Sequence, residues 1–116
     1  MAAIHHVAVV VDDLEKSIGF YTGALGFRLS AARPGHLGPG AWLDVGEQQL
    51  HLIQGAPGPA RGQHFAVLVD DLDAEVRRLR TEGFDVSDPV PVGSARQSFL
   101  ADPSGNAIEL HEKQQS

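Results

Sequence analysis

Four side chains of the kinds that bind divalent metals recur at matched spacing in this 116-residue sequence. His6 and His51 are 45 residues apart, and so are His64 and Glu109 (51 − 6 and 109 − 64). Imidazole nitrogens and a carboxylate suit Zn²⁺, Ni²⁺, Mn²⁺ or Fe²⁺, and four protein ligands leave positions open for water or a substrate. The spacing therefore predicts one divalent-metal site. Its expected ligands are His6, His51, His64 and Glu109.

A simpler explanation exists for each histidine taken alone, because a histidine on a strand is more often a hydrogen-bonded core residue than a ligand. Four candidates at repeated positions favour the metal site over that explanation. The other three histidines have different expected roles. His5 points to the face opposite His6, and His36 lies in a Gly/Pro-rich loop where solvent is its expected partner. His111 shares the strand face of Glu109 and is a candidate hydrogen-bond donor to it.

The segments that must position these side chains form an internal repeat. HVAVVVDDL at residues 6–14 and HFAVLVDDL at residues 64–72 share seven of nine residues at an offset of 58. Apolar residues continue at helical spacing after each segment. Each copy is therefore expected to begin with a strand followed by a helix.

Residues at the two ends of each expected helix support this interpretation. Asp12 and Asp70 each precede an acidic residue by three positions and are the expected N-caps. Gly26 and Gly83 follow the last apolar helical residues and are expected in the left-handed conformation that ends many helices.

Three short extended segments are expected after each helix, which makes each copy a βαβββ unit. They are expected at residues 27–31, 41–45 and 49–53 in the first copy and at residues 84–92, 98–101 and 107–111 in the second. Pro89 and Pro91 favour an edge strand or an irregular piece within 84–92. The expected class is α+β.

The copies are joined by a segment rich in glycine and proline. We expect one domain over residues 1–116, with a first module at 4–54, a linker at 55–62 and a second module at 63–112. The loop at 33–40 is equally rich in glycine and proline but lies inside the first module, so it is a candidate lid over a site.

Composition limits the partners and the compartment. Nine Lys and Arg against 15 Asp and Glu give a net charge of −6, which argues against nucleic acid or an anionic membrane as a partner. No stretch approaches the roughly 18 apolar residues of a membrane span. The absence of cysteine excludes disulfides and thiolate chemistry and fits a reducing compartment, so the expected location is the cytoplasm.

Module size predicts the state of assembly. A module of about 50 residues buries little apolar surface alone, so the two modules are expected to pair with each other or with those of another chain. A homodimer is therefore expected. Each metal site would then lie within one chain or be shared between chains that exchange modules.

Longer motifs in the chain resemble the vicinal oxygen chelate superfamily. They are the repeated H-x-A-V-x-V-D-D-L, the stretch SIGFYTGALGF at 17–27 and the stretch DPSGNAIEL at 102–110. The superfamily includes glyoxalase I, fosfomycin-resistance thiol transferases, extradiol dioxygenases and bleomycin-binding resistance proteins. The resemblance covers about residues 4–112 and is greatest to short glyoxalase-I-like members. It implies two tandem βαβββ modules forming a cup-shaped sheet around a metal, with the four expected ligands in the metal-binding positions.

The resemblance implies a metal-dependent glyoxalase-like enzyme whose small-molecule substrate chelates the metal through two vicinal oxygens. Glu109 is the expected catalytic base, because it is the only carboxylate among the four ligands. Two alternatives stay open: an antibiotic-binding protein of the bleomycin-resistance type, and an extradiol-type dioxygenase that uses His6, His64 and Glu109. The complete ligand set favours catalysis. Val10, where glutathione-type enzymes often have an arginine, favours binding.

The expected substrate pocket has apolar and charged candidates. Its wall is expected to include Trp42, Phe65, Phe99 and His111, with Ile53 and Leu68 as further apolar candidates. Three arginines are candidates to meet an acidic substrate group, with an ordinary surface position as the alternative for each. They are Arg28, Arg33 and Arg96.

Overall fold

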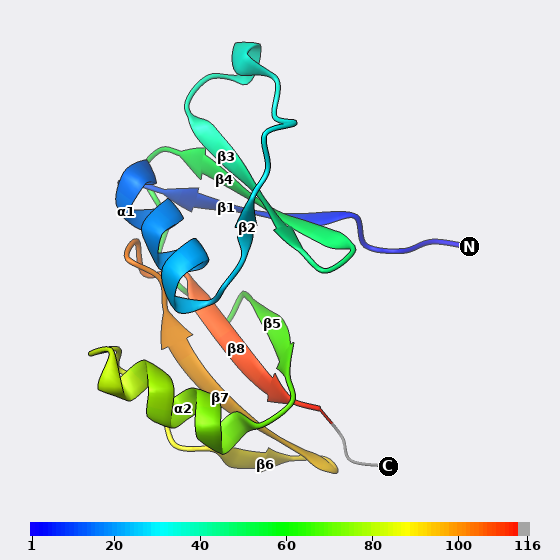
Figure 1. Ribbon diagram of the computed structural model, residues 1–116, viewed down its shortest axis with the longest axis vertical. Coiled ribbons are helices and arrows are strands. Elements are labelled where there is room, and N and C mark those ends of the chain that lie inside the picture. The colour runs from blue at the N-terminus through cyan, green and yellow to red at the C-terminus, as the bar shows by residue number, and fades with distance from the viewer. Residues whose placement is uncertain (114–116) are drawn as a thin grey trace. The chain divides into compact units, whose positions relative to one another are not determined.

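The computed structural model describes residues 1–113 as two compact units, each with a four-stranded sheet and a helix against it (Figure 1). Unit 1 comprises residues 1–59 together with 102–106, and unit 2 comprises residues 60–101 and the segment from 107. The α+β class and the two tandem βαβββ modules are confirmed. No helix within residues 1–113 has the length and apolar character needed to cross a membrane.

Unit 1 follows the order strand, helix, three strands. Its elements are β1 (His6–Val11), α1 (Leu14–Gly19), the π-helical turn η1 (Phe20–Ala24), β2 (Arg28–Leu29), the 3₁₀ turn η2 (Gly35–Leu37), β3 (Gly40–Val45) and β4 (Gln48–Gln54). The strands lie in the order β1-β4-β3-β2, with β1 parallel to β4 and the other pairs antiparallel.

Unit 2 repeats this arrangement. Its elements are β5 (His64–Val69), α2 (Leu72–Thr81), β6 (Val90–Val92), β7 (Ala95–Ala101) and β8 (Ala107–Glu112), and the strand order is β5-β8-β7-β6. His6 pairs with Gln49 and His64 pairs with Ala107, so both parallel ladders join residues 43 positions apart. The two copies of the sequence repeat therefore have the same strand register.

One face of each sheet forms the core of its unit. In unit 1 the buried strand residues alternate along the chain and are joined by residues of the helical segment; they include Val11, Leu43, Leu50, Leu52 and Tyr21. In unit 2 the corresponding set is Leu100, Ile108 and Leu110 with Leu72 and Leu79 of α2. Because side chains alternate across a strand, the histidines lie on the other face of each sheet.

The helix N-caps differ from the expectation by one residue. The side chains of Asp13 and Asp71 accept the hydrogen bonds from the backbone at the start of α1 and α2. Asp12 directly follows β1, and its carboxylate accepts a hydrogen bond from the Ser104 hydroxyl at 2.7 Å instead. The expected C-terminal glycines are confirmed, with φ of +72° at Gly26 and +96° at Gly83.

The segment 84–92, expected as an edge strand or an irregular piece, contains an edge strand and an irregular stretch before it. Only Val90–Val92 of the segment 84–92 forms a strand, whereas the preceding residues are irregular. The carbonyl oxygen of the buried Val86 accepts a hydrogen bond from Nη2 of Arg80 at 2.7 Å. This carbonyl therefore has a hydrogen-bond partner without a neighbouring strand. The strand expected at 27–31 is also shorter, since only Arg28–Leu29 pairs with β3.

A turn at residues 102–106 is held by buried polar contacts within unit 1. The Tyr21 hydroxyl donates to Asp102 Oδ2 at 2.6 Å, and the Asn106 amide donates to the carbonyl of Val10 at 2.9 Å. Asp102 also accepts from the backbone N–H groups of Ser104 and Asn106. Burial, with the Asp102 carboxylate beside it, raises the pKa of Tyr21 well above its usual range. Asp102 is only 4% exposed, and these hydrogen-bond donors satisfy its buried carboxylate.

Removing the tyrosine hydroxyl tests this turn. In Tyr21→Phe a buried carboxylate loses one donor, so we expect the free energy of unfolding to fall by about 1–3 kcal/mol in urea titrations. The same change in an Asp102→Asn background should cost less, which a double-mutant cycle measures. A loss within about 0.5 kcal/mol in the parent background would contradict a stabilising role for this contact.

Candidate metal and substrate site

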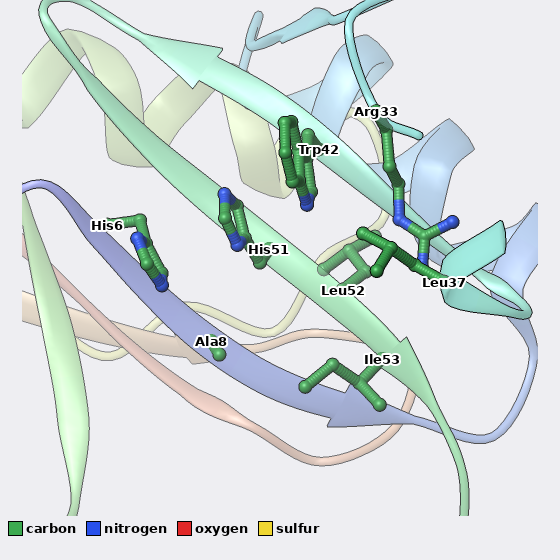
Figure 2. Close-up of a pocket in the computed structure, with 8 residues that line it drawn as sticks. All are labelled: His6, Ala8, Arg33, Leu37, Trp42, His51, Leu52 and Ile53. Carbon is green, nitrogen blue, oxygen red and sulfur yellow. The ribbon is translucent and has the colours of Figure 1, made fainter. Parts of the chain in front are cut away.

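His6 and His51 lie side by side on the open face of unit 1. Their rings stack with centroids 3.9 Å apart and planes 12° from parallel. Trp42 stacks on the other side of His51, with centroids 4.7 Å apart (Figure 2). The three rings come from neighbouring strands β1, β4 and β3, so the sheet order itself builds this row.

Each histidine of this pair has one ring nitrogen in contact with a nearby side chain. His51 Nε2 lies 2.9 Å from Oε1 of Gln49, and His6 Nδ1 lies 2.9 Å from Nδ1 of His5. His5 was expected to point away from His6, but it precedes β1 and its ring meets the neighbouring ring edge-on. One nitrogen of His6 and one of His51 remain for a ligand.

The charge state of His51 suits metal binding. Burial lowers the pKa of its imidazole, and the neighbouring His6, His5 and Arg33 lower it further because their positive charges oppose a second one. The neutral form is therefore favoured, and neutral imidazole is the form that binds a metal.

Unit 2 places a buried carboxylate between two histidines. Glu109 Oε1 lies 3.0 Å from His64 Nε2, and Glu109 Oε2 lies 2.7 Å from His111 Nδ1. The carboxylate residue is 8% exposed. Phe99 meets the His64 ring edge-on, with centroids 5.2 Å apart. His111 thus takes the position expected for a hydrogen-bond donor to Glu109.

His64 is fixed at both ring nitrogens. Its Nδ1 lies 2.9 Å from the carbonyl of Gly62, and this hydrogen bond raises the pKa of the imidazole. Burial acts against the increase, whereas the hydrogen bond and charge of Glu109 add to it. Because Nδ1–H donates to the carbonyl, Nε2 is the nitrogen that faces Glu109 and would serve a metal after losing its proton.

His111 was recognised from the sequence as a partner of a candidate ligand, but Gln49 and Gly62 were missed. Each lies two positions from the residue that it contacts, so for Gln49 and His111 the alternation of a strand places both side chains on one face. This two-residue spacing was a usable signal for Gln49. The Gly62 carbonyl had no such signal, because any residue type offers one.

A pocket of about 360 Å³ opens on the histidine face of unit 1 (Figure 2). It is lined by His6, Ala8, Arg33, Leu37, Trp42, His51, Leu52 and Ile53. Trp42 and Ile53 were expected here. Arg33 and Leu37 come from the Gly/Pro-rich loop that was a candidate lid, so this loop forms part of the wall.

The other expected wall residues belong to unit 2. Phe99 lies beside His64, and Leu68 is 63% exposed. Phe65 pairs with the buried Ile108, so strand alternation places its side chain on the face opposite His64. Phe65 therefore shares no sheet face with the candidate ligands of its own unit.

The three candidate arginines have different surroundings. Arg96 forms ion pairs with Asp73 at 2.9 Å and with Glu112 at 2.7 Å, and its hydrogen bonds lower the pKa of both carboxyl groups. Arg28 is exposed on β2. Only Arg33 of the three lines the pocket.

The expected metal ligands thus occur as one pair in each unit, His6 with His51 and His64 with Glu109. Among residues 1–113, no group of three or more His, Asp or Glu side chains is arranged to hold a metal ion. The donor set nevertheless fits a divalent transition metal, because three imidazoles and one carboxylate each offer an atom of the right kind.

Comparison with known protein families identifies the superfamily of this chain. The sequence profile of the Glyoxalase/Bleomycin resistance protein/Dioxygenase superfamily matches residues 3–110. The chain belongs to this superfamily. Its members usually use a divalent metal, and they include enzymes such as lactoylglutathione lyase.

Individual relatives differ in activity. The lactoylglutathione lyase of Salmonella typhimurium is 31% identical, over 92% of this chain and 90% of its own. A Bacillus anthracis structure assigned to the glyoxalase family is 27% identical with a TM-score of 0.87, over 98% and 97% of the two chains. TnmS3, an antibiotic binding protein from Streptomyces sp. CB03234, is 30% identical with a TM-score of 0.84, and each chain is covered to 98%. Superfamily membership alone therefore does not separate an enzyme from a binding protein.

The two pKa shifts predict different titrations for His51 and His64 in the metal-free protein. NMR should show His51 titrating below about 6.5 and His64 above it. The His64 contribution to stability is present below the unfolded value and lost as the pH rises through the folded one. Glu109→Gln should lower the pKa of His64 and leave that of His51 unchanged. Identical titrations of the two rings would contradict the described contacts.

Proposed function

We propose that this chain is a metal-dependent glyoxalase-like enzyme that acts on a small molecule able to chelate the metal through two vicinal oxygens. The observation that carries the proposal is the identical strand register in the two units, which places His6 beside His51 and His64 beside Glu109. Repetition of the core alone would not require a pair of metal-binding side chains on the opposite face of each sheet.

The proposed metal is one divalent ion, Zn²⁺, Ni²⁺, Mn²⁺ or Fe²⁺, held by His6, His51, His64 and Glu109. Contacts to Gln49 and to the Gly62 carbonyl support this assignment, because a metal-binding histidine usually has a partner at its other ring nitrogen. When bound, the metal would polarise the substrate oxygens and stabilise negative charge developing on them.

Glu109 is the residue that we propose moves the proton. Its carboxylate is buried, and the imidazoles of His64 and His111 contact its two oxygens and orient it. A base that transfers a proton between adjacent substrate carbons needs this fixed orientation and little surrounding water. His111 then acts as a positioning residue for Glu109.

We also propose that the protein works as a homodimer in the cytoplasm. The absence of cysteine suits a reducing compartment. Each unit has edge strands that a second chain can cover, β1 and β2 in one sheet and β5 and β6 in the other. The metal site then lies within one chain or is shared between two chains.

Removal of single ligands tests the metal site. Protein purified without chelator should bind about one metal per chain. His6→Ala and His64→Ala should each lose most of it, because each removes a ligand from a different unit. His36→Ala also removes an imidazole, but from an exposed loop, and should keep the metal. Unchanged metal content in both ligand variants would contradict the proposal.

Mixing the two ligand variants after joint refolding separates the two forms of the dimer. If the sites are shared between chains, a mixed dimer has one site with both defects and one site with none, so metal binding partly returns. If each site lies within one chain, the mixture stays defective.

Two substitutions at Glu109 separate ligation from proton transfer. In Glu109→Gln the amide oxygen can still coordinate but the amide cannot accept a proton. Turnover should therefore fall by about 10²-fold or more with metal retained at excess metal, whereas Glu109→Ala should lose both. Adducts of 2-oxoaldehydes with thiols, and catechols, are the substrates to screen first. Full turnover in metal-replete Glu109→Gln would leave Glu109 only a ligand role.

The second candidate function is the binding of a small molecule such as an antibiotic. Two observations favour it: the likeness to TnmS3, and a pocket with an aromatic stack formed entirely within unit 1. A binding protein would keep its small-molecule affinity in both Glu109 variants and would turn over none of the screened compounds.

A further inference from the structure

Arg33 is held in the pocket wall by its own loop. Its Nη1 donates to the carbonyl of Gly38 at 2.8 Å, which bridges the two ends of the turn η2. A Cβ atom at position 40 would lie 2.6 Å from Nη2 of Arg33 and 2.5 Å from the carbonyl oxygen of Leu52. Glycine at this position therefore lets the guanidinium lie close against the start of β3.

The guanidinium has no anionic partner within residues 1–113. Arg78, Arg80 and Arg96 all form ion pairs with carboxylates, whereas Arg33 forms none there, and its Nε and Nη2 donate no hydrogen bond to a described residue. The pocket lining contains no Asp or Glu either. Arg28, Arg61 and Arg77 form no ion pair within the described residues either, so what distinguishes Arg33 is its place in the pocket lining.

The remainder of the pocket is aromatic and apolar. Trp42 and His51 stack, and Leu37 and Ile53 are 48% and 49% exposed. Figure 2 shows the Arg33 side chain beside Leu37, reaching from its loop toward the pocket. An apolar group has exposed side chains to contact here, and an oxyanion attached to it has free guanidinium donors.

We infer that this pocket selects ligands that combine an apolar group with an oxyanion, and that Arg33 is the residue that recognises the oxyanion. The inference rests on the proposed function, because the pocket contains the candidate ligands His6 and His51. It extends that function by giving the substrate class a negative charge. A carboxylate or a phosphonate supplies the same chemistry, since a planar guanidinium can donate two parallel hydrogen bonds to either.

The test uses the full chain freed of metal, so that no bound cation can hold the oxyanion in place of Arg33. The probes are phenylacetate, benzylphosphonate and the neutral phenylacetamide. Trp42 is the only tryptophan in the sequence, so its indole N–H resonance in NMR spectra reports on the pocket directly.

At least one oxyanion should bind about tenfold more tightly than the amide, and Arg33→Met should remove that preference. Arg28→Met is the matched control, because it removes the same charge from an exposed strand position of the same unit, and it should keep the preference. Comparison of the two oxyanions identifies which group is favoured. The inference is overturned if the amide binds as well as both oxyanions, if no probe shifts the resonance, or if Arg33→Met keeps the preference.

The outcome of this test is distinguishable from that of the proposed function, because no metal or turnover enters the measurement. An oxyanion preference together with absent metal binding would support the role of Arg33 and reject the enzyme. Metal-dependent turnover without an oxyanion preference would support the enzyme and reject the role of Arg33.

Discussion

In both units the first strand of the repeat lies parallel to the last, with paired residues 43 positions apart. This pairing is what brings His6 beside His51 and His64 beside Glu109, although each pair is separated by 45 residues of chain. A shift of one residue in either ladder would turn a whole set of side chains to the opposite face. The register is protected by the core, because Leu50 and Leu52 in one sheet and Ile108 and Leu110 in the other would then become exposed.

The sheet order gives each pair its surroundings. In unit 1, β3 lies next to β4 and supplies Trp42, and the loop before β3 supplies Arg33. In unit 2, β7 lies next to β8 and supplies Phe99, whereas His111 comes from β8 itself. Two copies of one fold therefore provide different environments, an aromatic and cationic pocket in one and a carboxylate between imidazoles in the other.

Much of the fold was predictable because the repeat is visible in the residues. Local patterns predict the first strand of each copy, which begins at His6 or His64, and the helix that follows it. They also predict the left-handed glycines at 26 and 83. The N-caps were misplaced by one residue, since two adjacent aspartates offer equivalent caps and only the contact of Asp12 with Ser104 distinguishes them. The prolines of 84–92 indicated its irregular part, but the hydrogen bond from Arg80 to the Val86 carbonyl could not be predicted because it depends on tertiary packing.

The candidate site was predictable in residue type more than in its contacts. Sequence patterns indicate the four candidate ligands and Trp42, and strand alternation places His111 with Glu109. The patterns do not separate Arg33 from Arg28 and Arg96, because all three are surface-type residues with similar neighbours in the chain. Only the ion pairs of Arg96 and the loop contact of Arg33 tell their roles apart.

The most direct measurement is anomalous X-ray scattering from crystals of the metal-loaded protein, recorded at the absorption edge of the bound metal. We predict one strong peak per chain, at about 2.0–2.2 Å from one nitrogen each of His6, His51 and His64 and from a carboxylate oxygen of Glu109. A peak bound by only one of the two pairs, or a peak at other residues, would contradict the shared metal site.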